Sequence, residues 1–239
     1  MKQQILRYLE RDTLANIDMI GLLPLPAAEV LRWGEAGVLL RHGTLYLLAA
    51  EEGCANEFLP LMTRGLMECV ERQIIVRSGE LIPQLTREYG FFVSMECRHA
   101  VYPSAEPIPY SLPEGAEIRP LDVGYLDFVH AHYHMVDDAA YLRERLEAGM
   151  FGVFVGGRIA GFIGTHEEQT MGLLEILPDY RRLGLAYALE AHLINHLLSI
   201  GQTPFCQVAI HNEPSLRLQK KLGLTLSETV VNWLTYPAK

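Results

Sequence analysis

A buried strand that runs through a glycine turn into a helix constrains this chain more than any other stretch. Residues 171–177 are apolar apart from one glycine and Glu175, and Pro178 ends the run because proline cannot donate to a sheet ladder. From Leu185 to Leu197 a leucine recurs at every fourth residue, and Gly201 follows where a helix usually ends. The spacing therefore predicts a strand, a short loop and a long helix, in that order.

The loop between strand and helix combines two basic residues with two small ones. Arg181 and Arg182 come first, and Gly184 and Ala186 follow. At the first turn of a helix the amide groups lack a partner within the helix and lie at the positive end of its dipole, so they can receive a phosphate. The loop therefore predicts an anion site, although solvated arginines beside an ordinary helix-entry glycine would give the same pattern.

In this context the loop resembles the Arg/Gln-x-x-Gly-x-Gly/Ala pattern of the GNAT superfamily of N-acetyltransferases, and the likeness includes the preceding strand, Pro178 and Tyr180. The resemblance implies that the loop amides hold the pyrophosphate of acetyl-CoA (coenzyme A). It also implies that two strands part so that the pantetheine arm bonds to exposed backbone. The implied cofactor-binding residues are Ile176, Leu177, Arg181, Arg182, Leu183, Gly184, Leu185, Ala186 and Asn212.

Acyl transfer to an amine also needs a base, and Glu175 is the first candidate. It is the one charged residue in 171–177, and a carboxylate in such a strand is costly without a partner or a purpose. The alternative is a structural ion pair with an arginine such as Arg181 or Arg217. Further candidates for the base, each of which fits a solvated turn equally well, are His166, Glu167 and Glu168.

Asn212 and Ser215 begin a short predicted helix. Asn212 matches the GNAT asparagine that bonds the pantetheine arm, and it also suits a helix N-cap. Ser215 is the second catalytic candidate: it either reaches the cofactor or completes the first turn. Many GNAT enzymes place a tyrosine four residues before the glycine of this helix, to protonate the leaving thiolate. Gln219 stands there instead, so Ser215, a water or another tyrosine would do that work, or the thiolate leaves unassisted.

Composition narrows the class of protein. The chain has 239 residues, of which 49% are hydrophobic, and a formal charge of −9. The negative charge disfavours nucleic acid and anionic membranes as partners. No apolar run is long enough for a membrane span, and the start lacks the apolar core of a signal peptide. We therefore expect a cytoplasmic protein with a small-molecule amine or amino-acid acceptor, and the sequence does not indicate an oligomeric state.

The sequence predicts no metal site. The cysteines are widely spaced, without zinc-like clusters, and are expected to be reduced core residues. His130 and His134 would share a helix face, but a zinc site would need a further ligand. Contact with the acceptor is the better functional role for these histidines and for His132. The four cysteines are Cys54, Cys69, Cys97 and Cys206.

A proline-rich segment separates two halves. Residues 102–117 contain four prolines, a composition typical of a linker. We therefore expect domains at 1–115 and 116–239. In the first half the patterns predict helices at 1–16, 56–73 and 80–89, a loop or short helix at 17–28, a hairpin of strands 38–40 and 45–49, and strands 74–76 and 91–101. None of these repeats the phosphate loop.

In the second half the patterns predict helices at 123–134, 137–148 and 212–222, strands at 151–155, 159–165 and 205–210, and one or two closing strands in 225–236. This order resembles the GNAT fold, with closest likeness to the glycine N-acyltransferase-like branch. That likeness rests on Gly161–Gly164, on Leu177–Arg181, and on Asn212 with Ser215, Leu222 and Gly223. It implies an α/β fold of tandem GNAT-like domains: a degenerate amino-terminal half, and a complete carboxy-terminal half with a mixed, mostly antiparallel central sheet.

We therefore expect an N-acyltransferase that moves an acetyl or other short acyl group from coenzyme A to an amine by direct attack. Two alternatives remain. A catalytically silent CoA-binding or sensing module would fit Gln219 and the degenerate first half. A protein acetyltransferase would result if the first half recognises a protein.

Overall fold

The chain folds into two α/β units. The computed structural model describes residues 1–66, 68 and 71–237. One unit contains Met1–Ala100, Val208–Leu216 and the chain from Leu226 onward, and the other contains Val101–Gln207 with Arg217–Thr225. The α/β class is therefore confirmed, whereas the domain limits 1–115 and 116–239 stay a prediction. Among the described residues, no helix combines the length and the apolar character needed to cross a bilayer.

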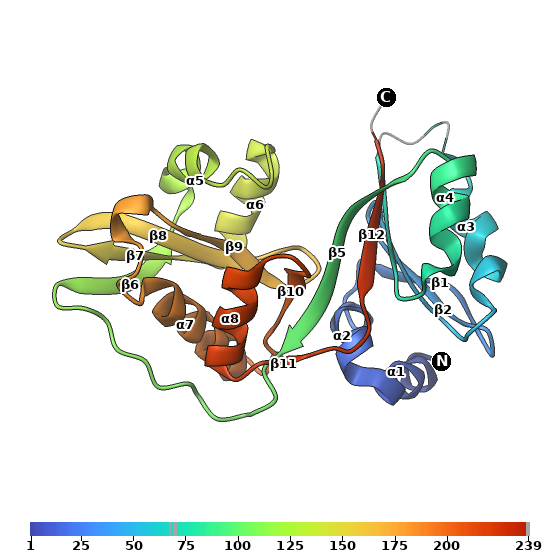
Figure 1. Ribbon diagram of the computed structural model, residues 1–239, viewed down its shortest axis with the longest axis horizontal. Helices are drawn as coiled ribbons and strands as arrows, with labels where there is room; N and C mark the ends of the chain where they lie inside the picture. Colours follow the sequence, from blue (N-terminus) through green and yellow to red (C-terminus); the bar gives the residue numbers. More distant parts are fainter. Residues whose placement is uncertain (67, 69–70, 238–239) are drawn as a thin grey trace. The chain divides into compact units, whose positions relative to one another are not determined.

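Figure 1 labels the elements along the chain. The helices are α1 (Lys2–Leu9), α2 (Thr13–Leu22), α3 (Leu59–Thr63), α4 (Ile82–Glu88), α5 (Leu126–His132), α6 (Ala139–Gly149), α7 (Leu185–Ser199) and α8 (Glu213–Leu222). The strands are β1 (Ala28–Gly34), β2 (Gly37–His42), β3 (Leu45–Ala50), β4 (Arg72–Val76), β5 (Phe92–Val101), β6 (Ala116–Leu121), β7 (Met150–Val155), β8 (Arg158–Thr165), β9 (Met171–Ile176), β10 (Phe205–Ala209), β11 (Thr225–Leu226) and β12 (Val231–Tyr236).

The sheet of the first unit runs in the order β1-β2-β3-β4-β12-β5. The hairpin β2–β3 is confirmed, whereas β1 has no counterpart in the sequence prediction. The last strand, β12, pairs antiparallel with both β4 and β5. The assignment of 225–236 as closing strands of the second half is therefore wrong for β12. Its buried Val231 and Leu234 instead complete the apolar clusters of the first unit.

The helices of the first unit also differ from the sequence prediction. The helix expected at 1–16 is divided by a short 3-10 turn, Glu10–Asp12, and α2 extends to Leu22. Because α2 is buried on most sides, its sequence lacks an amphipathic stripe. The helix expected at 56–73 is reduced to a 3-10 turn and α3. Residues 67, 69 and 70 of that expected helix, and with them Cys69, lie outside the described residues.

The second unit carries the strands β6-β7-β8-β9-β10. Its first four strands pair antiparallel, and β9 pairs with β10 in parallel. Figure 1 shows α5 and α6 on one side of these strands and α7 on the other. Helix α7 packs against β7, β8 and β9. The strand, loop and helix of 171–199 are therefore confirmed.

Strand β9 contains a bulge in its middle. Phe162 of β8 pairs with Glu175 and Gly164 with Gly172, so two residues of β9 oppose one of β8. Leu173, inside the bulge, has a φ of 52°, an uncommon value for a side-chain-bearing residue. A bulge bends its strand and interrupts the ladder. The only register pair between β9 and β10, within the described chain, joins Met171 to Cys206, before the bulge.

Candidate functional site

A pocket of about 250 Å³ lies at the start of α7. Most of the predicted anion loop lines it, together with residues of α8. The lining residues are Ile176, Tyr180, Arg181, Arg182, Gly184, Leu185, Ala186, Tyr187, Leu218 and Lys221. The structure thus brings most of the sequence-predicted loop residues to one pocket wall. The exception is Leu183, which is half-exposed and lines a second pocket beside the first.

The first turn of α7 has no cap from a side chain. Gly184 is the N-cap residue with a φ of 81°, and no side chain bonds to the helix start. The Ala188 amide donates to the Gly184 carbonyl over 3.1 Å, so the amides of Leu185 to Tyr187 lie ahead of the i→i−4 hydrogen bonds of the helix. A Cβ atom built on Gly184 would meet no atom within 4 Å. The amides of this turn are therefore open to an anion, and the open side of Gly184 leaves room for one.

The two arginines of the loop behave differently. Arg181 turns back onto β9: its Nε donates to the Ile176 carbonyl over 3.0 Å, and a terminal nitrogen lies 3.1 Å from Glu175 Oε1. Arg182 is exposed, and its φ is 68°. Left-handed backbone at Arg182 and again at Gly184 gives the loop a tight path, of the kind that forms concave anion sites from successive amides. Both arginines are exposed, and Arg181 is the one held against β9.

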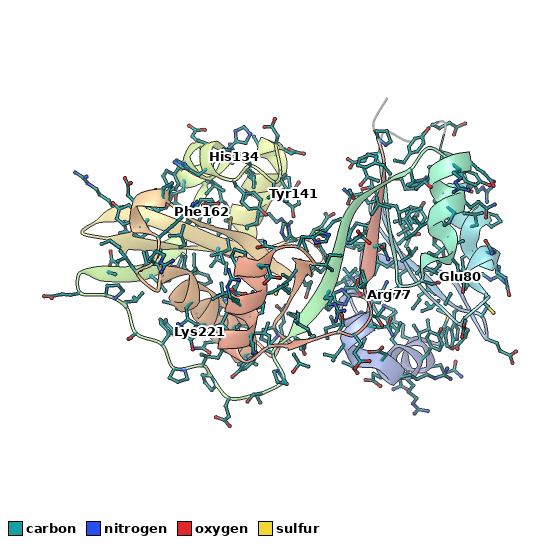
Figure 2. The ribbon with its side chains drawn as sticks, in the orientation of Figure 1. Arg77, Glu80, His134, Tyr141, Phe162 and Lys221 are labelled. Carbon is teal, nitrogen blue, oxygen red and sulfur yellow. The ribbon has the colours of Figure 1, made fainter. Side chains whose placement is uncertain are left out.

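Lys221 and Tyr187 are site residues that the sequence reasoning missed. Lys221 Nζ lies 4.9 Å from the centre of the Tyr187 ring, and both residues line both pockets. Figure 2 shows Lys221 on α8. A lysine here places a second positive charge beside the open amides of α7. Lys221 becomes a pocket residue only because α8 packs next to α7, and the two residues are far apart in sequence.

Glu175 forms the ion pair that the alternative interpretation described. Its partner is Arg181. The Glu175 side chain is 29% exposed, and the Arg181 side chain is 58% exposed. An ion pair this open to solvent stabilises the fold by about 1 kcal/mol or less. The pair accounts for a carboxylate in β9 without excluding a second use. The catalytic role of Glu175 therefore stays a prediction.

Ile176 and Leu177 occupy the end of β9. Ile176 is buried and lines the pocket. The Leu177 amide donates to the Ala160 carbonyl over 2.9 Å, and the Leu177 carbonyl accepts from the Tyr180 amide. A pantetheine arm would have to replace these bonds to use the Leu177 backbone. Contact of Leu177 with the cofactor stays a prediction, and its side chain is the more accessible group for it.

Polar side chains gather next to the β9 bulge. Burial raises the pKa of Tyr133 to about 12, and its hydroxyl bonds to the Leu173 backbone. Tyr141, on α6 (Figure 2), bonds to His166 Nδ1 over 2.6 Å. Burial lowers the pKa of His166 to about 4, so this imidazole is neutral and only weakly basic at neutral pH. Glu168 is buried and accepts from Thr170 over 3.0 Å.

The two predicted site residues at the start of α8 form a helix cap. The Ser215 amide donates to Asn212 Oδ1 over 3.2 Å, as the N-cap interpretation requires. Both residues belong to the first contact unit, whereas the pocket at Gly184 belongs to the second. Their roles in cofactor binding and catalysis stay predictions. Gln219, in the tyrosine position of the family, is buried and donates to Glu190.

The histidine cluster does not lie on one helix face. Helix α5 ends at His132, so the expectation that His130 and His134 share a face is wrong. His130 bonds to Asp137 over 2.9 Å, and His132 bonds to the Phe128 carbonyl. Within the described ranges, no three His, Cys, Asp or Glu side chains are placed to hold a metal ion. Of the described cysteines, Cys97 and Cys206 are buried and Cys54 is partly exposed.

Comparison with known proteins relates the fold to acetyltransferases. Residues 150–234 match the family described as FR47-like protein. No curated protein matches the sequence. A Drosophila protein of known structure is 16% identical, with a TM-score of 0.78 over 98% of this chain and 94% of that chain.

Two further structures carry acetyltransferase descriptions. A GCN5-related N-acetyltransferase from Kribbella flavida is 13% identical, with a TM-score of 0.61 over 95% of this chain and 97% of that one. A tandem GNAT protein from the clavulanic acid biosynthesis pathway is 15% identical, with a TM-score of 0.53 over 99% and 95%. The second of these supports the expectation of tandem GNAT-like halves. The chain therefore has the α/β fold of GNAT N-acetyltransferases, and its residues 150–234 are similar to the FR47-like family.

Proposed function

We propose that this protein is an acyl-CoA-dependent N-acyltransferase. It would move an acetyl or other short acyl group from the coenzyme A thioester to the amine of a small molecule or amino acid. The observation that carries the proposal is the uncapped start of α7, which opens into a pocket beside Lys221. We place the enzyme in the glycine N-acyltransferase-like branch, supported by residues 161–164 and 177–181, and in the cytoplasm.

The loop residues fit the diphosphate of coenzyme A on three counts. The amides at the start of α7 lack a side-chain cap. Gly184 has open space where a Cβ would stand. Arg182 and Lys221 supply positive charge at the pocket. Diphosphate bound there would be stabilised by charge-assisted hydrogen bonds and by the helix dipole.

When bound, the thioester supplies a carbonyl carbon that is open to attack. The acceptor nitrogen would form the new C–N bond and lose its proton to a base, while the C–S bond breaks and the sulfur leaves as a thiolate that takes a proton from Ser215 or water. Glu175 is the proposed base. It would act after Arg181 moves from the carboxylate to the diphosphate, because both groups compete for the same guanidinium. Ser215 is proposed to assist the leaving sulfur.

The β9 bulge supports this arrangement. A strand whose ladder is interrupted has backbone amides that point away from the sheet's hydrogen bonds. Such an amide near Leu174 would donate to the thioester carbonyl as negative charge develops there, a contribution that is often a few kcal/mol.

A catalytically silent CoA-binding module is the second candidate. It is favoured by Gln219, whose buried carboxamide already bonds to Glu190 and is a poor acid in any case. A protein acceptor is the third candidate, for which an open acceptor groove would be needed.

Turnover separates these candidates. Thiol release from acetyl-CoA is measured with a panel of amines, amino acids and peptides, for the native protein and for Glu175→Gln. Because a positioned base contributes about 10² to 10⁴ in rate, we expect kcat of the variant to fall by that factor while coenzyme A still binds. Arg181→Met breaks the same ion pair and leaves the carboxylate. Because Arg181 is also a proposed diphosphate ligand, this variant is compared at saturating acetyl-CoA, where its kcat should fall less than that of Glu175→Gln. Binding without turnover for every acceptor would instead favour the silent module.

A further inference from the structure

A buried carboxyl of α7 meets a buried carboxamide of α8 inside the second unit. Glu190 is 3% exposed and Gln219 is 2% exposed. Gln219 Nε2 donates to Glu190 Oε1 over 2.8 Å. Neither side chain lines the pocket at Gly184. The proposed chemistry therefore gives them no direct role.

The remaining oxygen of each side chain lacks a partner. Glu190 Oε2 and Gln219 Oε1 are both buried without a hydrogen bond to any described residue. If Glu190 is ionised, both atoms are acceptors, and leaving them buried and unpaired costs about 1–3 kcal/mol each. A proton on Glu190 Oε2 converts that atom into a donor for Gln219 Oε1. One proton thus satisfies both atoms.

We propose that Glu190 is held as a neutral carboxylic acid in a ring of two hydrogen bonds with Gln219, and that this ring positions α8 against α7 beside the pocket. Gln219 Nε2–H donates to Glu190 Oε1, and Glu190 Oε2–H donates to Gln219 Oε1. The second half of this proposal, positioning for the ligand, rests on the proposed coenzyme A site.

The ring and the pocket lie on the same pair of helices. Tyr187 is three residues before Glu190 on α7, and Lys221 is two residues after Gln219 on α8. Helices α7 and α8 therefore meet at two places. The Lys221 ammonium lies over the aromatic ring of Tyr187 at the exposed end of the contact, and the Glu190–Gln219 pair lies at the buried end. Ionisation of Glu190 would leave two unpaired acceptors at the buried end, and the Lys221–Tyr187 contact at the exposed end would loosen as a result.

Burial is the main reason for a neutral Glu190. It raises the pKa of this carboxyl to about 7, against a smaller opposite effect of the Gln219 hydrogen bond, and no charged group contributes. The other titratable side chains on α7 and on the elements packed against it are Tyr187, His192, His196, Arg158, Glu175, Glu213, Arg217, Lys220 and Lys221. None of them is a cause of the raised pKa of Glu190.

The sign of the pH dependence follows from linkage. The carboxyl binds its proton more tightly in the folded protein (pKa about 7) than at its ordinary value of 4.5. Its contribution to stability is therefore complete below about pH 4.5 and is lost as pH rises towards 7. His166 titrates with the opposite sign, because its folded pKa is lowered. Only a difference between variants isolates Glu190.

The test compares Glu190→Gln with the native protein in urea unfolding from about pH 5 to pH 8. The variant keeps the shape of the ring with two carboxamides and has nothing to titrate. We expect the unfolding equilibrium constant of the native protein to rise against that of the variant by up to tenfold per pH unit to about pH 7, and then to level off. Glu147→Gln, at an exposed glutamate, is the control: the ratio of the native to the variant unfolding equilibrium constant should stay the same from pH 5 to pH 8. A flat ratio for Glu190→Gln would overturn the ring.

Infrared spectra test the proton directly and do not depend on the variant's stability. The spectrum of Glu190→Gln is the reference, so that a band from another buried carboxyl, such as that of Glu168, is present in both proteins and cancels. The native protein should show a carboxylic-acid C=O band at about pH 6 that disappears by about pH 8. Absence of the band at pH 6 would contradict a neutral Glu190.

Ligand affinity tests the positioning role. Calorimetry with coenzyme A should show that the affinity of the native protein falls severalfold relative to that of Glu190→Gln between pH 6 and pH 8. The ratio is used because the phosphate monoester of the ligand titrates in the same range for both proteins. Parallel pH profiles for the two proteins would overturn the positioning role. If neither protein binds coenzyme A at any pH, the proposed function fails together with the positioning role, and the unfolding ratio still decides the ring.

Discussion

Two helices, one in each unit, begin in different ways: α2 of the first unit has a side-chain cap, whereas α7 of the second has none. Helix α2 begins at Asp12, whose carboxylate accepts from the Ala15 amide over 3.0 Å. Helix α7 begins at Gly184 with no side chain in that role. A helix end without a cap costs stability unless a ligand takes its place. The start of α7, unlike that of α2, therefore has room for the anion that we propose.

The buried carboxyls repeat the contrast. Asp18 of α2 bonds to Arg77, which Figure 2 shows in the first unit, and lies 3.5 Å from His99 Nε2. Although burial acts against ionisation, Arg77 and His99 together hold the pKa of Asp18 well below its usual range. Glu190 has no cation, and its pKa rises to about 7. The buried carboxyl of the first unit is therefore held ionised by its cations, whereas the raised pKa of the second favours the protonated form below about pH 7.

The largest expected effect is the loss of the Asp18 charge. Asp18→Asn leaves Arg77 buried without its anion, and removal of one partner from a buried ion pair costs about 3–5 kcal/mol. The measurement is the free energy of unfolding in urea at neutral pH. Glu51→Gln, which breaks the exposed pair with Arg11 in the same unit, is the control and should cost about 1 kcal/mol or less. Equal costs would remove the contrast between the units.

The next largest effect is expected when the uncapped start of α7 receives a carboxylate by mutation. Gly184→Asp places a negative charge at the start of α7, where a residue of this type tolerates the left-handed backbone. We expect about a 100-fold loss of coenzyme A affinity, or about 2.7 kcal/mol, with unfolding stability retained because the helix dipole favours the charge. Gly157→Asp is the matched control, since Gly157 has a φ of 78° in the β7–β8 turn. Similar losses in both variants would mean that folding, not the anion site, is affected.

A smaller effect concerns the cation on α8. Lys221→Met removes the ammonium that lines the pocket, and about tenfold weaker binding of coenzyme A follows from the loss of one charge-assisted contact. Lys220→Met removes a neighbouring exposed charge of the same helix that does not line the pocket. Calorimetry at low and at high salt distinguishes them, because only the first should flatten the salt dependence.

The smallest effect concerns the capped start of α2. Asp12→Ala removes the cap of α2 and should lower the free energy of unfolding by about 1 kcal/mol. The affinity for coenzyme A should not change. If stability is also unchanged, the cap has no measurable role, and the contrast between the starts of α2 and α7 loses its energetic basis.

Local signals were enough to predict the strand, loop and helix of 171–199. Pro178 and Gly184 mark the loop, and the leucine spacing marks α7, so the pattern needs no distant partner. The same holds for the β2–β3 hairpin, whose turn residues lie between two apolar runs. The anion loop itself was predicted for the same reason, since Arg181–Ala186 are contiguous.

The sequence could not predict contacts between distant residues. Strand β12 pairs with β4 and β5, and nothing within Val231–Tyr236 specifies those partners. Lys221 becomes a pocket residue only because α8 faces α7. The Glu190–Gln219 contact is hidden by the leucine stripe, in which a single glutamate reads as a surface residue. The break at Glu10–Asp12 within the helix expected at 1–16 was missed, because no glycine or proline in residues 1–16 marks the interruption.

The most direct measurement of the central claim is a titration with coenzyme A followed by 15N-resolved NMR of the backbone amides. We expect the largest, saturating shifts at residues 182–187, with little change at Ala15, whose amide already has the Asp12 carboxylate as partner. The same titration of Gly184→Asp should leave the loop signals in place. If the loop amides of the native protein do not respond, or if the shifts fall in the first unit instead, the start of α7 is not an anion site and the proposed function is wrong.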